Sequence, residues 1–123
     1  MKYQYVTMDD LVVLTLNGEV NQTSWEICFL EVEQLFKADD YARLLIDGTG
    51  LTEFHMSSQQ CSEVAAGFLR FANKAAFFSD NKLIFGMMRM IHSWAFNDQF
   101  QVFKTRESAA HFLAEHNGKH QPA

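Results

Sequence analysis

Two adjacent serines, Ser57 and Ser58, are the residues whose position points most directly to chemistry. They precede an amphipathic run that predicts a helix, and a helix N-terminus offers free backbone amides and a positive dipole end. A serine hydroxyl there can accept a phosphoryl group, which adds about −1.5 to −2 of charge. The same hydroxyl can instead cap the helix by accepting a backbone hydrogen bond, which is the commoner role. The sequence leaves both interpretations open.

A second polar segment, Asp47-Gly48-Thr49-Gly50, follows a short apolar run. Open α/β sheets bind ligands beyond the carboxyl ends of their strands, so Asp47 and Thr49 are candidate ligand contacts in a strand-end loop. The segment has too few glycines for a phosphate-binding loop, and no Gly-Lys-Ser/Thr follows it. A plain turn is therefore the favoured interpretation.

The helix predicted after Gly86 carries more apolar surface than its own core contacts require. Its apolar residues span an arc of about 160°, wider than the ~100° stripe of a helix that packs on one side. Methionine side chains adapt to varied apolar shapes. The excess is either buried by neighbouring phenylalanines or forms a surface for a ligand or protein partner. The candidate residues are Met87, Met88, Met90, Ile91 and Trp94.

Catalytic and metal-binding patterns are lacking in the sequence. The spacing of His111, His116 and His120 is loosely helical, but no carboxylate or cysteine completes a site with them. No Ser-His-Asp order, HExxH or paired-carboxylate motif is visible. Cys28 and Cys61 fall in apolar helical patterns, which predicts buried, reduced thiols. We therefore expect no enzymatic activity, no cofactor and no metal.

Short β-rich runs indicate about five strands. The first two, at residues 3–7 and 11–16, flank Asp9-Asp10, and this pattern predicts an antiparallel hairpin that ends at Asn17-Gly18. Residues 43–46 form a continuously apolar run, as in a central strand covered on both faces. The remaining strands are predicted at residues 83–85 and 101–103.

Four amphipathic segments alternate with these strands. The first helix is predicted from a capping box at Thr23-Ser24-Trp25-Glu26 to Asp39-Asp40. The second follows Ser57-Ser58 and buries a stripe that includes Phe68. The third runs from Gly86 to about Trp94, and the fourth from a Thr105 cap through His116. This order predicts an α/β fold with a mixed sheet of about five strands flanked by four helices.

Size and charge restrict the classes of function. The chain has 123 residues, a size typical of one domain, which we expect at residues 1–116 with a polar tail at 117–123. Its formal net charge is −5, with 10 basic residues dispersed along the chain. That distribution argues against nucleic acid as a partner. The N-terminus lacks a signal-peptide pattern and no apolar run is long enough to span a membrane, so a soluble cytoplasmic protein is expected.

The order of elements and several local motifs resemble the STAS domain, in particular its SpoIIAA-like branch, which shares its fold class with Sec14-type lipid-binding proteins. The matching residues are the hairpin ending at Gly18, the strand Leu44-Leu45-Ile46-Asp47, a glycine-x-x-arginine-methionine pattern, and Val102-Phe103 before a capped helix. The glycine pattern is formed by Gly86, Arg89 and Met90. These are packing motifs, and they cover nearly the whole chain.

In STAS proteins that antagonise anti-sigma factors, a serine at the start of the second helix is phosphorylated within an Asp-Ser-Ser-Gly motif. The corresponding segment here is His55-Met56-Ser57-Ser58. Histidine replaces the aspartate, methionine aligns with the acceptor serine and the glycine is missing. The resemblance therefore implies a phosphoacceptor only at Ser57 or Ser58.

Three functions follow in order of preference. The first is a non-enzymatic regulatory module that docks a protein partner, or a second copy of itself, through the start of the second helix and the third helix. The second is a carrier or sensor of a small apolar or lipid-like ligand, in keeping with the Sec14-type kinship. The third is a phospho-regulated anti-sigma factor antagonist. An enclosed apolar cavity beside the third helix would favour the second, and an exposed patch the first.

Overall fold

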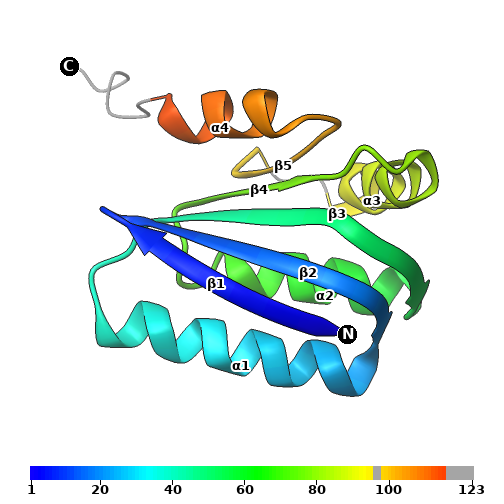
Figure 1. Ribbon diagram of the computed structural model, residues 1–123, viewed down its shortest axis with the longest axis horizontal. Coiled ribbons are helices and arrows are strands. Elements are labelled where there is room, and N and C mark those ends of the chain that lie inside the picture. The colour runs from blue at the N-terminus through cyan, green and yellow to red at the C-terminus, as the bar shows by residue number, and fades with distance from the viewer. Residues whose placement is uncertain (96–97, 116–123) are drawn as a thin grey trace.

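A five-stranded sheet forms the centre of the molecule, with helices on both faces (Figure 1). The structure is a computed structural model that describes residues 1–95 and 98–115. The strands are β1 Lys2–Met8, β2 Leu11–Asn21, β3 Arg43–His55, β4 Lys74–Phe78 and β5 Phe100–Phe103. The helices are α1 Gln22–Ala38, α2 Ser58–Phe68, α3 Lys82–Ala95 and α4 Arg106–Ala114.

The strands lie side by side in chain order, from β1 at one edge to β5 at the other. The β1–β2 pair is antiparallel, and the pairs from β2 to β5 are parallel. The hairpin turns at Asp9, whose φ of 54° lies in the left-handed region. These features confirm the predicted α/β class, the mixed sheet and the N-terminal hairpin.

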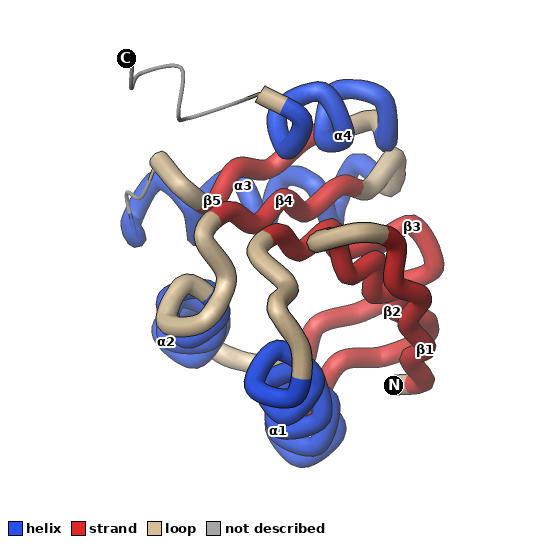
Figure 2. The backbone as a smooth tube through the Cα atoms, turned by 90° about the vertical axis from the view of Figure 1, so that its left-hand side faces the viewer, coloured by secondary structure: helices blue, strands red, loops and turns tan. Residues whose placement is uncertain are grey.

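Two apolar layers cover the sheet, as the end-on view in Figure 2 shows. Helices α1, α2 and α3 pack on one face, where Phe68 is only 1% exposed and forms an edge-to-face pair with Trp25, with 5.8 Å between the ring centroids. Helix α4 packs alone on the other face through Ala109 and Leu113. The predicted burial of Phe68 is confirmed.

Two predicted boundaries near the N-terminus are wrong. Strand β2 does not end at Asn17-Gly18 but continues to Asn21, because Gly18 adopts a φ of 92° that lets the strand pass an irregularity in its pairing. Helix α1 is capped by Asn21, whose Oδ1 accepts from the backbone N of Ser24 at 2.9 Å, and not by Thr23. The predicted end at Asp39 is confirmed.

Strand β4 was predicted in the wrong segment. Residues Leu83–Phe85 are β-rich in type but belong to α3, because Asn81 Oδ1 accepts from the backbone N of Leu83 and of Ile84 and so caps the helix there. The true β4, Lys74–Phe78, is fully buried between β3 and β5. Its two alanines have weak strand propensity, and burial on both faces overrides that propensity.

Helix α4 is held at its C-terminal end by two cations from the sheet. Lys74 Nζ donates to the backbone oxygens of Phe112 at 2.9 Å and Glu115 at 3.1 Å. Arg43 Nη1 donates to the Leu113 oxygen at 2.9 Å. Positive charge at a helix C-terminus complements the helix dipole, so these contacts fix α4 on the sheet. The helix starts at the predicted Thr105 cap but ends at Ala114 with Glu115 as its C-cap, so the predicted continuation through His116, itself outside the described residues, is wrong.

Candidate functional site

The start of α2 has the geometry of a helix cap. Ser57 Oγ accepts from the backbone N of Gln60 at 3.1 Å, and the Gln60 side chain accepts from the backbone N of Ser57 at 2.9 Å. The predicted capping role of Ser57 is thus confirmed. Its side chain is also exposed, which a phosphoacceptor requires. The side chain of Ser58 lies outside the described residues.

The candidates at Asp47 and Thr49 do not lie in a loop. Strand β3 runs through them to His55, so the predicted strand end at Ile46 and the strand-end loop are wrong. The longer strand forms because β2 also continues and pairs with it as far as Asn21–His55. Asp47 Oδ1 accepts from the backbone N of Thr49 at 3.0 Å. The structure therefore does not bring these two residues together with the start of α2.

One side of helix α3 packs into the core, and another side exposes apolar residues to solvent. Ile84 and Met88 are buried, whereas Leu83 is 66% and Met90 is 50% exposed, with Met87 between these extremes. Positions 83, 87 and 90 share one face of a helix. We call Leu83, Met87 and Met90 the α3 stripe. The side chains of Ile91 and Trp94 lie outside the described residues.

The sequence analysis does not include Leu83 in this surface, because it predicts a strand at residues 83–85. The missed signal was Asn81, a good N-cap residue just before the apolar period. Phe85 lies on the flank of the helix between two cations. Arg89 Cζ is 5.8 Å and Lys104 Nζ is 5.3 Å from the centre of its ring. Apolar surface beside positive charge suits a protein surface of opposite charge better than a lipid interior.

The apolar cavity beside α3 is very small. It has a volume of about 20 Å³ and is lined by side chains of α1, α2, α3 and the sheet, among them Trp25, Phe54, Cys61 and Met88. Such a volume holds about one water-sized molecule. Among the described residues, this cavity is too small to hold a lipid-like ligand.

Both cysteines lie in the core, where burial disfavours the thiolate form. Burial raises the pKa of Cys28 to about 12, with the charge of Glu31 as a second cause, and burial raises the pKa of Cys61 to about 11. The thiolate is the form that reacts and binds metals. The predicted buried thiols are confirmed.

A shallow groove of about 320 Å³ also runs between α1 and α2, lined by residues that include Trp25, Phe29, Leu30, Gln60 and Arg70. It is adjacent to the start of α2 because Gln60 lies in that helix's first turn. Sequence periodicity could not show this groove, since it depends on how the two helices pack.

No protein-family model matches the chain, and no curated protein matches its sequence. Solved structures do match it over nearly its whole length. An anti-sigma factor antagonist from Mycobacterium paratuberculosis is 15% identical with a TM-score of 0.70, over 93% of this chain and 94% of that chain. The phosphorylated form of the Bacillus cell fate determinant SpoIIAA is 16% identical with a TM-score of 0.65, over 89% and 97%.

An uncharacterised protein from Shewanella loihica PV-4 with a SpoIIAA-like fold is 13% identical with a TM-score of 0.62, over 92% of this chain and 93% of that chain. This chain therefore has the SpoIIAA-like STAS fold that the sequence motifs predicted. Within the described residues, no helix is long and apolar enough to cross a membrane.

Proposed function

We propose that this chain is a non-enzymatic, cytoplasmic regulatory module that docks a protein partner through the α3 stripe and the start of α2. The observation that carries the proposal is the α3 stripe itself. Leu83 and Met90 keep at least half of their surface exposed on a helix whose other side is buried. Clustered apolar surface with a charged rim is typical of protein interfaces.

The names of the structural neighbours support the same class of function. The Mycobacterium paratuberculosis protein is an anti-sigma factor antagonist, and so is SpoIIAA, whose unphosphorylated form also matches this chain. By analogy, the partner is a regulatory protein of the anti-sigma factor type. A second copy of this chain is the other partner that the apolar stripe would fit.

Capture of partners from the native cells tests the proposal with one matched control. The wild type, Leu83→Lys and Ile27→Lys are compared; Ile27 is an apolar residue of α1 that is 56% exposed, so its substitution adds the same charge elsewhere. A protein retained by the wild type and by Ile27→Lys, but lost with Leu83→Lys, supports the proposal. Sedimentation shows whether a second copy is that protein. Identical captured sets for all three proteins would refute it.

Phosphorylation of Ser57 would regulate this partner binding. Two observations support it: the Ser57 side chain is exposed, and one structural neighbour was solved in a phosphorylated form. Asp and Asn both cap helices as well as Ser does, so Ser57→Asp adds charge while Ser57→Asn does not. If phosphate is the switch, Ser57→Asp weakens partner binding and Ser57→Asn leaves it unchanged. Equal binding by both variants would leave Ser57 with its capping role alone.

A further inference from the structure

Three side chains that could bind a metal ion converge at the end of the β2–β3 pair. His55 Nε2 lies 3.1 Å from Glu19 Oε1 and 3.7 Å from Glu53 Oε1. One ligand atom from each residue lies within 4.8 Å of the other two. The set thus offers one imidazole nitrogen and two carboxylate oxygens around a single point.

The register of the two strands places this set. Glu19 on β2 is paired with Glu53 on β3, and Asn21 is paired with His55. Glu53 and His55 are two residues apart, so they leave the strand on the same face. The residues between them in the pattern, Val20 and Phe54, pack into the core on the opposite face. The three polar side chains therefore project from strands that the core holds in place.

The two distances from the imidazole fit a tetrahedral ion. With zinc–nitrogen and zinc–oxygen bonds of about 2.0–2.2 Å, neighbouring ligand atoms of a tetrahedron are about 3.4 Å apart. The two distances from His55 Nε2, 3.1 and 3.7 Å, lie on either side of that value. Three protein ligands would leave a fourth position for water.

Charge also favours a cation here. Glu19 and Glu53 are paired across neighbouring strands, and like charges placed opposite each other are destabilising. A divalent ion bound between them would neutralise both carboxylates. The sequence prediction missed the set because His55 and Glu19 are 36 residues apart and meet only through the strand register.

We propose that Glu19, Glu53 and His55 bind one divalent transition-metal ion of the zinc type. The imidazole selects against Mg²⁺ and Ca²⁺, which prefer oxygen ligands alone. The ligands are about half exposed, so the ion remains open to water. The site lies two residues before the Ser57 cap, and the ion would tie the end of β2 to the β3–α2 connection. It does not depend on the function proposed above.

Calorimetric titration of the full chain with ZnCl₂ tests the site. His116 and His120 are replaced by Gln in every protein, which removes the tail histidines as competitors. We expect one Zn²⁺ per chain, and each of Glu19→Gln, Glu53→Gln and His55→Gln should weaken binding by about tenfold or more. MgCl₂ should give no comparable binding.

The matched control is His111→Gln. His111 is also an exposed histidine beside a carboxylate, at 3.9 Å from Glu115 Oε2, but it has one such partner in the described structure and not two. Its loss should leave the Zn²⁺ affinity unchanged. Circular dichroism verifies that each variant is folded, and Zn²⁺ should raise the Tm of the wild type and of His111→Gln only. No Zn²⁺ binding below the millimolar range, or equal affinity in all variants, would overturn the proposal.

Discussion

Gly48 and Gly86 have opposite surroundings, and their substitution tests the packing at the scale of single residues. A Cβ on Gly48 would lie 2.3 Å from Cζ of the buried Phe77 ring, so Gly48→Ala should cost about 1–3 kcal/mol. A Cβ on Gly86 would meet no atom within 4 Å, and Gly86 lies inside a helix. Gly86→Ala should therefore stabilise the protein by up to about 1 kcal/mol.

Urea unfolding of the two alanine variants measures both changes, and each variant is the control for the other. The opposite signs are the essential expectation. If Gly86→Ala destabilised the protein as much as Gly48→Ala does, α3 would not have the position described.

The ion pair between Asp10 and Arg43 makes the stability of the protein depend on pH. A hydrogen bond and the charge of Arg43 hold the pKa of this carboxyl below its ordinary value of 3.8, against an opposing effect of burial. A carboxylate with a lowered pKa in the folded state stabilises it above its unfolded pKa, and this contribution is lost as the pH falls through the folded pKa.

Asp10→Asn should therefore be less stable than the wild type at pH 6, and the difference should shrink as the pH falls below about 4. Urea unfolding at several pH values measures this. A difference that stays constant from pH 6 to pH 2 would show that the charge of Asp10 is not responsible.

At the scale of elements, the sequence predicted the hairpin, the start of the central strand, β5 and the helix caps at Ser57 and Thr105 well, because local patterns determine them. It failed where packing overrides local preference. The alanines of β4 have weak strand propensity and form a strand only between β3 and β5. Strand β3 continues past Asp47 only because β2 pairs with it, which no local pattern indicates.

The attachment of α4 to the sheet is an element-scale prediction. Lys74 is 5% exposed and donates to two carbonyls at the end of α4, and its Nζ lies 4.4 Å from the centre of the Phe112 ring. Hydrogen bonds from charged groups contribute about 1.5–3 kcal/mol. Lys74→Met keeps the apolar stem, so it should lower the free energy of unfolding by about 2 kcal/mol.

Lys37→Met is the matched control, because the Lys37 side chain is 63% exposed and its pair with Glu33, at 3.8 Å, should contribute little. Denaturant unfolding compares the two variants. An equal effect of both substitutions would mean that Lys74 does not hold α4 in place.

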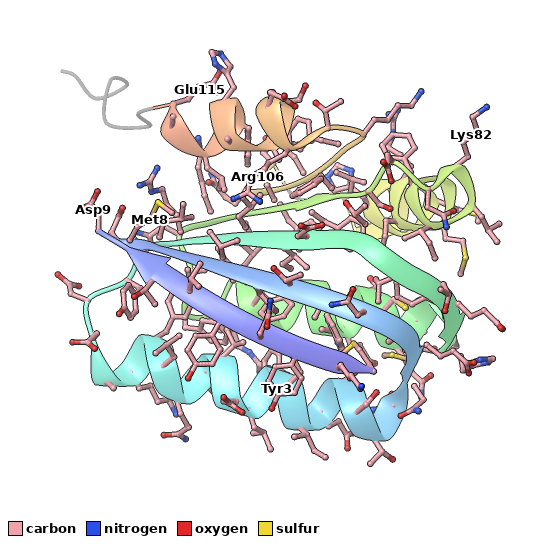
Figure 3. All side chains as sticks on the ribbon, in the orientation of Figure 1. Tyr3, Met8, Asp9, Lys82, Arg106 and Glu115 are labelled. Atoms are coloured by element: carbon pink, nitrogen blue, oxygen red, sulfur yellow. The ribbon has the colours of Figure 1, made fainter. Side chains whose placement is uncertain are left out.

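At the scale of the whole molecule, the ribbon in Figure 3 has α1 and α2 below the sheet and α4 above it. The labelled Tyr3 lies between β1 and α1. Tyr3 Oη donates to Glu31 Oε1 at 2.5 Å, and this bond, with burial and the Glu31 charge, raises the pKa of Tyr3 to about 12. The hairpin is thereby joined to the helical layer.

The candidate site could be predicted only in part. The α2 cap and the methionines of α3 follow from local sequence, and the exposed position of the stripe emerges from the packing of Ile84 and Met88 into the core. The small cavity beside α3 and the Glu19, Glu53 and His55 set depend on contacts between distant segments, which periodicity does not report.

The most direct test of the account is the Kd of the captured partner for the wild type, Leu83→Lys and Ile27→Lys, each purified and shown to be folded. If the α3 stripe is the docking surface, Leu83→Lys should weaken binding by about tenfold or more, which corresponds to about 1.4 kcal/mol. Ile27→Lys should bind within about twofold of the wild type, because a charge outside an interface has little effect on affinity. Wild-type affinity in Leu83→Lys, or an equal loss in Ile27→Lys, would contradict the assignment of the docking surface to α3.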